Sequence, residues 1–168
     1  MRKLSYFIIY ALSVATLLTG CGDIVPVWVG EIILEDHTLY YTDLPRELDM
    51  VLESEEALMD LRLELEVTYY AGMKRSQLPI FIAIEDGQNP AKIQSTKIKL
   101  KENGEWIGER HENEIDYILT HEAISSIKLK PGKYKMKIYA NDEEAEKIVG
   151  VIKIIARMYQ NSNSEDAA

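Results

Sequence analysis

Apart from the carboxylates, few side chains have the chemistry for catalysis or metal binding. The chain has three histidines, one cysteine and 28 Asp and Glu residues. His111 and His121 lie in an acidic stretch that contains Glu109, Glu112, Glu114, Asp116 and Glu122. Imidazole and carboxylate groups together are ligands that suit divalent transition metals. In a chain this acidic, solvated loop residues give the same pattern, so we expect no bound metal and no cofactor.

No known catalytic motif accompanies these residues. The sequence contains no G-x-S-x-G, no Walker-type loop and no H-E-x-x-H. A pair of carboxylates at the spacing used by glycosidases is available in any chain with 28 acidic residues, so it does not indicate hydrolysis. We therefore expect a protein that is not an enzyme.

The single cysteine, Cys21, follows a segment with the layout of a secretory signal. Arg2 and Lys3 precede an apolar run of about fifteen residues, shorter than the roughly 20 needed to span a bilayer. The residues Leu18-Thr19-Gly20-Cys21 resemble the lipobox of bacterial lipoproteins. We expect residues 1–20 to be a signal peptide, Cys21 to carry acyl chains such as palmitate, and residues 21–27 to form the lipidated tether.

The charge of the chain argues against nucleic acid as a partner. The net charge is -9, and removal of the two positive charges in residues 1–20 leaves -11 on the mature chain. Such a chain is repelled by phosphate backbones and by anionic lipid, so acyl chains at Cys21 must hold it to the membrane. The acidic run that follows the cysteine in some surface-exported Bacteroidetes lipoproteins is absent. We expect an envelope protein that faces the periplasm, on the inner or the outer membrane.

Apolar and charged residues alternate along much of the chain, which is the two-residue period of a β-strand. The clearest case is 61–69, and Leu78–Ile84 is apolar on both faces, as in a strand buried within two layers. Further strands are predicted at Trp28–Leu34, Thr38–Thr42, Ile93–Lys101, Ala123–Lys130, Lys133–Ala140 and Ile148–Met158.

Turn-forming pairs separate these segments: Asp86-Gly87, Asn103-Gly104 and Pro131-Gly132. About eight short strands predict an all-β fold, a two-layer antiparallel sandwich of the immunoglobulin or jelly-roll kind, over residues 28–160. Leu44–Asp60 partly fits a 3.6-residue period, which leaves a short helix open there. The polar residues 161–168 are predicted to be a disordered tail.

Two groups of side chains are candidates for binding. Aromatic residues could stack on sugars, although in a sandwich they more often belong to the core: Tyr40-Tyr41, Tyr69-Tyr70, Trp28 and Trp106. Trp106 stands out because Gly104 and Gly108 flank it, which indicates a special turn or close backbone packing. Lysines line one face of two strands, at Lys97, Lys99 and Lys101 and at Lys133, Lys135 and Lys137, where solvated faces are more usual than partner sites.

Several segments, in order, are similar to the gliding-motility lipoprotein GldH family of Bacteroidetes. They are Cys21, Leu44-Pro45, Val67-Thr68-Tyr69-Tyr70, Leu78–Ile84, Asn103–Gly108, Pro131–Tyr134 and Lys147–Val151. The similarity covers nearly the whole mature chain and rests on the order of the elements. A tryptophan that often follows the Leu-Pro element is missing, and the segment after Ala140 is shorter.

The resemblance implies an accessory lipoprotein of the gliding machinery, which is linked to type IX secretion, and it implies no catalytic residue. The expected function is therefore non-enzymatic contact with other envelope proteins from a membrane anchor at Cys21. Glycan binding through the aromatic residues is the alternative.

Overall fold

The structure is a computed structural model that describes residues 24–40, 45–111, 115–141 and 147–161. Several predictions lie outside these ranges: the signal peptide 1–20, the lipidated Cys21 with the start of the tether, Tyr41, Leu44, Glu112, Glu114 and the tail after Asn161. No helix in the described ranges is long and apolar enough to cross a membrane.

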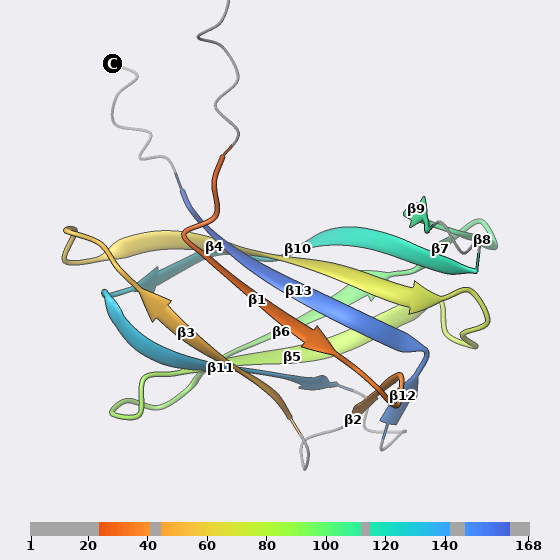
Figure 1. Cartoon of the computed structure of the whole chain (residues 1–168), viewed down its shortest axis with the longest axis horizontal. Coiled ribbons are helices and arrows are strands. Elements are labelled where there is room, and N and C mark those ends of the chain that lie inside the picture. The colour runs from red at the N-terminus through yellow and green to blue at the C-terminus, as the bar shows by residue number, and fades with distance from the viewer. Residues whose placement is uncertain (1–23, 41–44, 112–114, 142–146, 162–168) are drawn as a thin grey trace, which may run out of the picture.

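The larger of two stacked sheets has five strands (Figure 1). Their order is β1 (Trp28–Ile33), β13 (Val151–Gln160), β4 (Met59–Tyr70), β10 (Asp116–Leu129) and β9 (Glu109–Arg110). Every neighbouring pair is antiparallel. The long central strand β4 is therefore paired along both edges.

The second sheet has four strands, also antiparallel, and packs against the first. Their order is β3 (Arg46–Leu52), β11 (Gly132–Ala140), β5 (Gln77–Glu85) and β6 (Lys92–Lys99). Two short ladders complete the fold: β2 (Thr38–Tyr40) with β12 (Lys147–Val149), and β7 (Lys101–Glu102) with β8 (Glu105–Trp106). The predicted all-β, two-layer antiparallel sandwich is confirmed.

The core lies between the two sheets and follows the alternation in the sequence. In β4 the buried positions are Met59, Leu61, Leu63, Leu65, Val67 and Tyr69, while the residues between them are mostly half-buried. Strand β5 contributes Leu78, Ile80 and Ile82 from the opposite sheet. Removing such side chains from water supplies most of the free energy that holds the layers together, at about 1.5–3 kcal/mol each.

The helix considered at Leu44–Asp60 is wrong for the described residues 45–60. Residues 46–52 form β3, with Met50 and Leu52 buried and Val51 exposed. The 3.6-residue fit needed Val51 on the apolar face. A period of two describes the segment instead, because β3 pairs with β11 from Arg46 to Leu52 and turns Leu48, Met50 and Leu52 inward.

Three predicted strands also differ from the observed ones, and the first is Ile93–Lys101, which is divided at Leu100 into β6 and β7. β10 begins at Asp116, seven residues before the predicted Ala123, and contains two register shifts where it pairs with β4. The predicted strand 148–158 is divided at Gly150 into β12 and β13. Gly150 has a φ of +107°, and a Cβ there would overlap the side chain of Met73, so only glycine fits the break.

The antiparallel registers define two ends of the sandwich. At the N-terminal end, β1 begins and β13 finishes, and the connections 53–58, 86–91 and 130–131 link the strands. At the Trp106 end lie the connections 71–76 and 100–111, with β7, β8 and β9 on the right of Figure 1. The chain thus enters the domain at the end opposite Trp106.

Candidate functional site

Trp106 lies on a two-stranded hairpin whose turn is dictated by its sequence. Asn103 has a φ of +51° and Gly104 a φ of +87°, between β7 and β8. Positive φ at both central residues is the requirement of a type I′ turn, which Asn-Gly meets best. A Cβ at Gly104 would meet nothing within 4 Å, so backbone conformation is the reason for glycine at this position.

Gly108, on the other side of Trp106, is needed for two reasons. Its φ is +105°, and a Cβ there would overlap the carbonyl oxygen of Ile118 in β10. The two glycines therefore fold the segment back so that its backbone lies against β10. Both expected features are therefore present: the special turn lies at Gly104, and the close backbone packing lies at Gly108.

The indole of Trp106 belongs to an aromatic cluster with Tyr69 and Tyr117. Ring centroids are 5.6 Å apart for Tyr69 and Trp106, 5.9 Å for Tyr69 and Tyr117, and 6.4 Å for Trp106 and Tyr117. The Lys101 ammonium lies 3.8 Å from the centre of the Trp106 ring. A cation over the ring face is electrostatically favourable, and it occupies a face that a sugar would need.

Tyr69 is fully buried beneath this hairpin. Its hydroxyl donates to the carbonyl oxygen of Ile107 and lies 3.2 Å from that of Leu100. Burial raises the pKa of Tyr69 to about 12, so the hydroxyl keeps its proton and remains a donor. The aromatic cluster therefore packs the hairpin against β4, and the role of these aromatic residues is structural.

Within the described ranges, the remaining predicted stacking residues do not join Tyr69 in an open groove. Tyr70 is 46% exposed and faces away from the core, and Trp28 packs against the core as a partly buried side chain. Tyr40 donates from its hydroxyl to Asp36, at 2.9 Å. The aromatic residues are thus dispersed over several elements.

The lysine rows form contacts within their own domain. Lys135 lies 2.7 Å from Glu47 and Lys137 lies 2.8 Å from Glu85, which links β11 to its neighbours β3 and β5. In the other row, Lys99 pairs with Glu102 at 2.5 Å and Lys101 covers Trp106. Carboxylates on adjacent strands thus pair with two lysines of the β11 row, and a carboxylate three residues away pairs with one lysine of the other row.

The two histidines considered for metal binding lie apart from any ligand set in the described ranges, where no group of three His, Cys, Asp or Glu is arranged to hold an ion. His121 Nε2 is 2.9 Å from the hydroxyl oxygen of Thr96 on β6. Burial lowers the pKa of His121, against the opposing influence of Glu122. His121 therefore helps to close the gap between β10 and β6.

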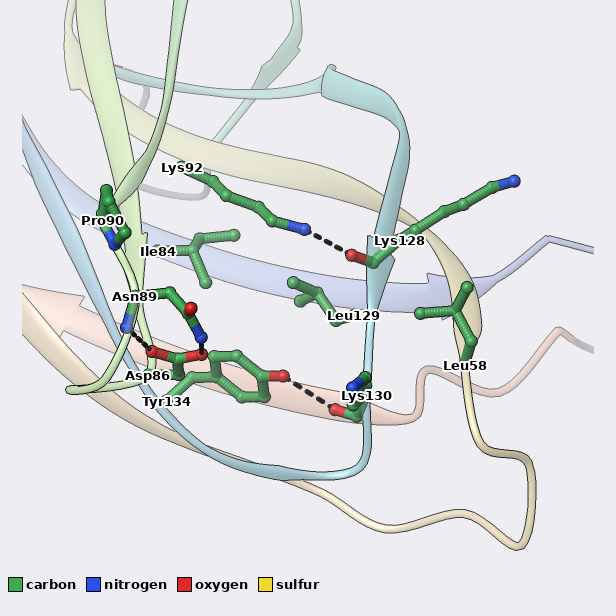
Figure 2. A pocket seen from close by; sticks show the side chains of 10 residues that line it. All are labelled: Leu58, Ile84, Asp86, Asn89, Pro90, Lys92, Lys128, Leu129, Lys130 and Tyr134. Atoms are coloured by element: carbon green, nitrogen blue, oxygen red, sulfur yellow. Dashed lines mark hydrogen bonds between the residues drawn. The ribbon is translucent and has the colours of Figure 1, made fainter.

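A cavity of about 220 Å³ opens at the N-terminal end, between the β5–β6 connection and the link from β10 to β11 (Figure 2). Ile84 and Leu129, both nearly fully buried, form its floor, and Leu58 stands at its edge. Lys92 reaches across the opening and donates to the carbonyl oxygen of Lys128, at 2.5 Å. The cavity thus combines an apolar floor with a cationic rim.

The other side of this cavity is held by hydrogen bonds within the chain. Asp86 accepts from the backbone and side-chain amides of Asn89, each at 2.7 Å, and from the Gln88 backbone at 2.9 Å. These donors lower the pKa of Asp86 to about 2. The Tyr134 hydroxyl donates to the Lys130 carbonyl at 2.9 Å.

No pattern in the sequence indicated this cavity. The pairs Asp86-Gly87 and Pro131-Gly132 predict turns, but nothing along the chain indicates that both turns lie at the same end of the sandwich. The lysines that line the cavity come from strands that are far apart in sequence, since Lys92 and Lys128 are 36 residues apart. The site could have been predicted only from knowing that these two turns lie together at one end of the sandwich.

Comparisons with known proteins give no family. No family model matches the chain, and no curated protein matches it. Solved structures with a similar outline include the mosquito-larvicidal Cry4Aa toxin of Bacillus thuringiensis, with 9% identity and a TM-score of 0.44 over 79% of this chain and 21% of the toxin.

Two further structures have lower scores. Eiger TNF of S. frugiperda has 6% identity and a TM-score of 0.39 over 85% of this chain and 98% of that protein. The complex of the Aeromonas sobria serine protease with its chaperone has 7% identity and a TM-score of 0.36, over 90% of this chain and 30% of that one. The chain thus spans less than a third of the toxin and of the matched chain in the protease complex. Likenesses of this size carry no functional argument.

Proposed function

We propose that this protein is a membrane-anchored envelope lipoprotein that acts without catalysis, by binding other envelope proteins with its Trp106 end. The observation that carries the proposal is the polarity of the sandwich. β1 begins at Trp28, seven residues after Cys21, and at the end opposite Trp106. An acylated Cys21 therefore leaves the Trp106 end as the part of the domain that points away from the membrane.

The short connection sets the reach of the domain. Seven extended residues span at most about 25 Å, so the N-terminal end of the sandwich stays near the bilayer surface. The Trp106 hairpin is held rigid by Tyr69 and Tyr117, with Lys101 over the indole and Arg110 over the ring of Tyr117. A preorganised surface of this kind binds a partner at a lower entropic cost than a mobile loop does.

The resemblance to the GldH family supplies the biological setting of the proposal: an accessory component of the gliding and type IX secretion machinery, facing the periplasm. Within this proposal the Gly104–Trp106–Gly108 segment serves to shape the binding surface. Glycan binding remains the alternative, but Lys101 over the Trp106 ring and the buried Tyr69 leave little open aromatic face for a sugar.

The anchor is tested by replacing the only cysteine. Cys21→Ser should abolish palmitate labelling and move the protein from the membrane fraction to the soluble fraction. Lys147→Gln, an exposed change on β12, is the matched control and should remain in membranes. Membrane attachment of the Cys21→Ser protein would contradict the anchor.

The partner surface is tested with a photo-crosslinking residue placed at Glu105, beside Trp106, or at Glu55, an exposed position in the 53–58 connection. We expect crosslinks to a defined envelope protein from position 105 and none from position 55. Equal crosslinking from both positions, or none from position 105, would contradict the proposed orientation. A glycan array probed with the same protein tests the alternative function, glycan binding.

A further inference from the structure

The cavity at the N-terminal end has a cationic rim within an acidic protein. Lys92, Lys128 and Lys130 line it, and its one carboxylate is Asp86. The side chain of Lys128 points away from the opening in Figure 2, which leaves the ammonium groups of Lys92 and Lys130 at the rim. Neither of these two ammonium groups forms an ion pair with a described residue. The local charge is therefore opposite to the net charge of the chain, and an anion that enters meets ammonium groups that are free to pair with it.

Lys92 is the better placed of the two. An ammonium group has three donors, and one of them goes to the Lys128 carbonyl oxygen. The bond holds Lys92 across the opening, as Figure 2 shows, with two donors left over. The lysine is thus positioned before any ligand arrives.

Asp86 does not cancel this attraction. Both of its oxygens are used by donors of its own turn, Gln88 and Asn89. In Figure 2 Asp86 lies beside Tyr134, on the side of the cavity opposite Lys92, with Ile84 and Leu129 between them. An anionic group beside Lys92 is therefore separated from the carboxylate by the apolar floor.

The apolar floor and the volume of the cavity determine the apolar part of the ligand. Ile84 and Leu129 offer apolar surface at the base, and Leu58, 49% exposed, extends it to the edge. About 220 Å³ is below the roughly 300–1,000 Å³ of sites for drug-sized molecules. The cavity suits one short apolar chain with a charged head.

We propose that this cavity binds a small carboxylate with a short apolar tail, its head paired with Lys92 and Lys130 and its tail on Ile84, Leu129 and Leu58. The same chemistry is offered by a free short-chain acid and by the C-terminal residue of a protein. The site is independent of the anchor and of the Trp106 surface, so its failure would leave the proposed function intact.

The test is an NMR titration of the full chain, labelled with ¹³C at the Ile and Leu methyl groups. The ligands are hexanoate and N-acetyl-leucine, and the latter mimics the C-terminus of a protein. We expect saturable shifts of the Ile84, Leu58 and Leu129 methyl signals by at least one of them, with a Kd of about 1 mM or tighter. Tighter binding of hexanoate identifies a free short-chain acid as the ligand, and tighter binding of N-acetyl-leucine identifies the C-terminal residue of a protein.

Control ligands separate the two halves of the site. Hexanol lacks the charge and inorganic phosphate lacks the tail, and each should bind at least about tenfold more weakly than the better carboxylate. Binding of hexanol or phosphate as tight as that of the carboxylate would overturn the proposal. The absence of saturable shifts with both carboxylates would overturn it too.

Variants assign the binding to the residues. Lys92→Gln and Lys130→Gln should each weaken carboxylate binding about tenfold, the value of one charge-assisted hydrogen bond. Leu58→Ser should weaken it several-fold, and Lys147→Gln, at the other end of the sandwich, should leave it unchanged. Unchanged methyl spectra without ligand show that each variant is folded, and undiminished binding in all of the cavity variants would overturn the assignment.

Discussion

The hydroxyl of Tyr69 in β4 donates a hydrogen bond to the backbone carbonyl of Ile107, 38 residues away in the segment after β8. The same hydroxyl lies 3.2 Å from the carbonyl of Leu100, just before β7. One buried side chain therefore holds both arms of the Trp106 hairpin against the large sheet. The rigidity of the proposed binding surface depends on this contact.

Tyr69→Phe should lower the free energy of unfolding by about 1–3 kcal/mol, because it removes the donor from the part-buried carbonyl oxygen of Ile107, whereas that of Leu100 still accepts from the Ile107 N–H. Urea denaturation measures the loss. Tyr139→Phe is the matched control, since its hydroxyl makes no hydrogen bond within the described residues and its removal should change little. Equal effects from the two variants would show that the Tyr69 hydroxyl contributes nothing.

Gly108→Ala and Gly104→Ala should differ, although both residues have positive φ. At Gly104 the cost is conformational, about 1–2 kcal/mol. At Gly108 the added methyl group also overlaps the Ile118 carbonyl oxygen, which should add about 1–3 kcal/mol. Thermal unfolding of the two variants compares them, and a Gly108→Ala protein as stable as Gly104→Ala would refute the packing argument.

Stability should fall as the pH drops below 6.5, in part because of His121. Burial lowers the pKa of His121 in the folded state from its ordinary value of 6.5. Between the folded and unfolded values the unfolded chain binds more protons, so its population rises as the pH decreases. The stability contribution is thus present above pH 6.5 and is lost toward the lower folded pKa.

His121→Gln should flatten this part of the pH profile, since glutamine can keep the contact with Thr96 but does not titrate. Urea midpoints measured from pH 7.5 to 5 check the effect. An identical slope in the two proteins would mean that other groups cause the loss.

Glu47→Gln should destabilise the protein slightly at low salt and not at high salt. Glu47 accepts from Lys135, and this hydrogen bond is the main reason why the pKa of Glu47 is lowered. The pair is exposed, so added salt screens it. Melting temperatures at about 0.01 M and 1 M NaCl make the comparison, and a difference that persists at high salt would contradict a screened surface pair.

The sequence was informative where one face of a strand is buried. β4 was predicted because each second residue from Leu61 to Tyr69 is apolar, and the core requires that pattern. The start of β10 was missed because Tyr117, Ile118 and Leu119 form an apolar run without alternation, and all three are half-buried. Residues 46–52 were ambiguous because Val51 is an exposed apolar residue on an edge strand.

The two candidate sites differ in how much of each could be predicted from the sequence. The segment around Trp106 was visible because Gly104 and Gly108 are local requirements of the backbone. The cavity depends on Lys92 and Lys128, which meet only because an antiparallel sandwich brings the 86–91 connection and the end of β10 to the same place. A distant pairing of this kind leaves no local pattern.

The register of β1 determines how the domain carries mechanical load. β1 is paired with β13 at six positions from Trp28 to Ile33, and the chain enters this ladder at Trp28, at the end opposite Trp106. A pull on the preceding residues, resisted at the Trp106 end, loads the whole β1–β13 ladder in shear, so its hydrogen bonds share the force instead of opening one after another. Under the proposed function, a domain held by its first strand in this way can transmit tension between the membrane and a bound partner while it stays folded.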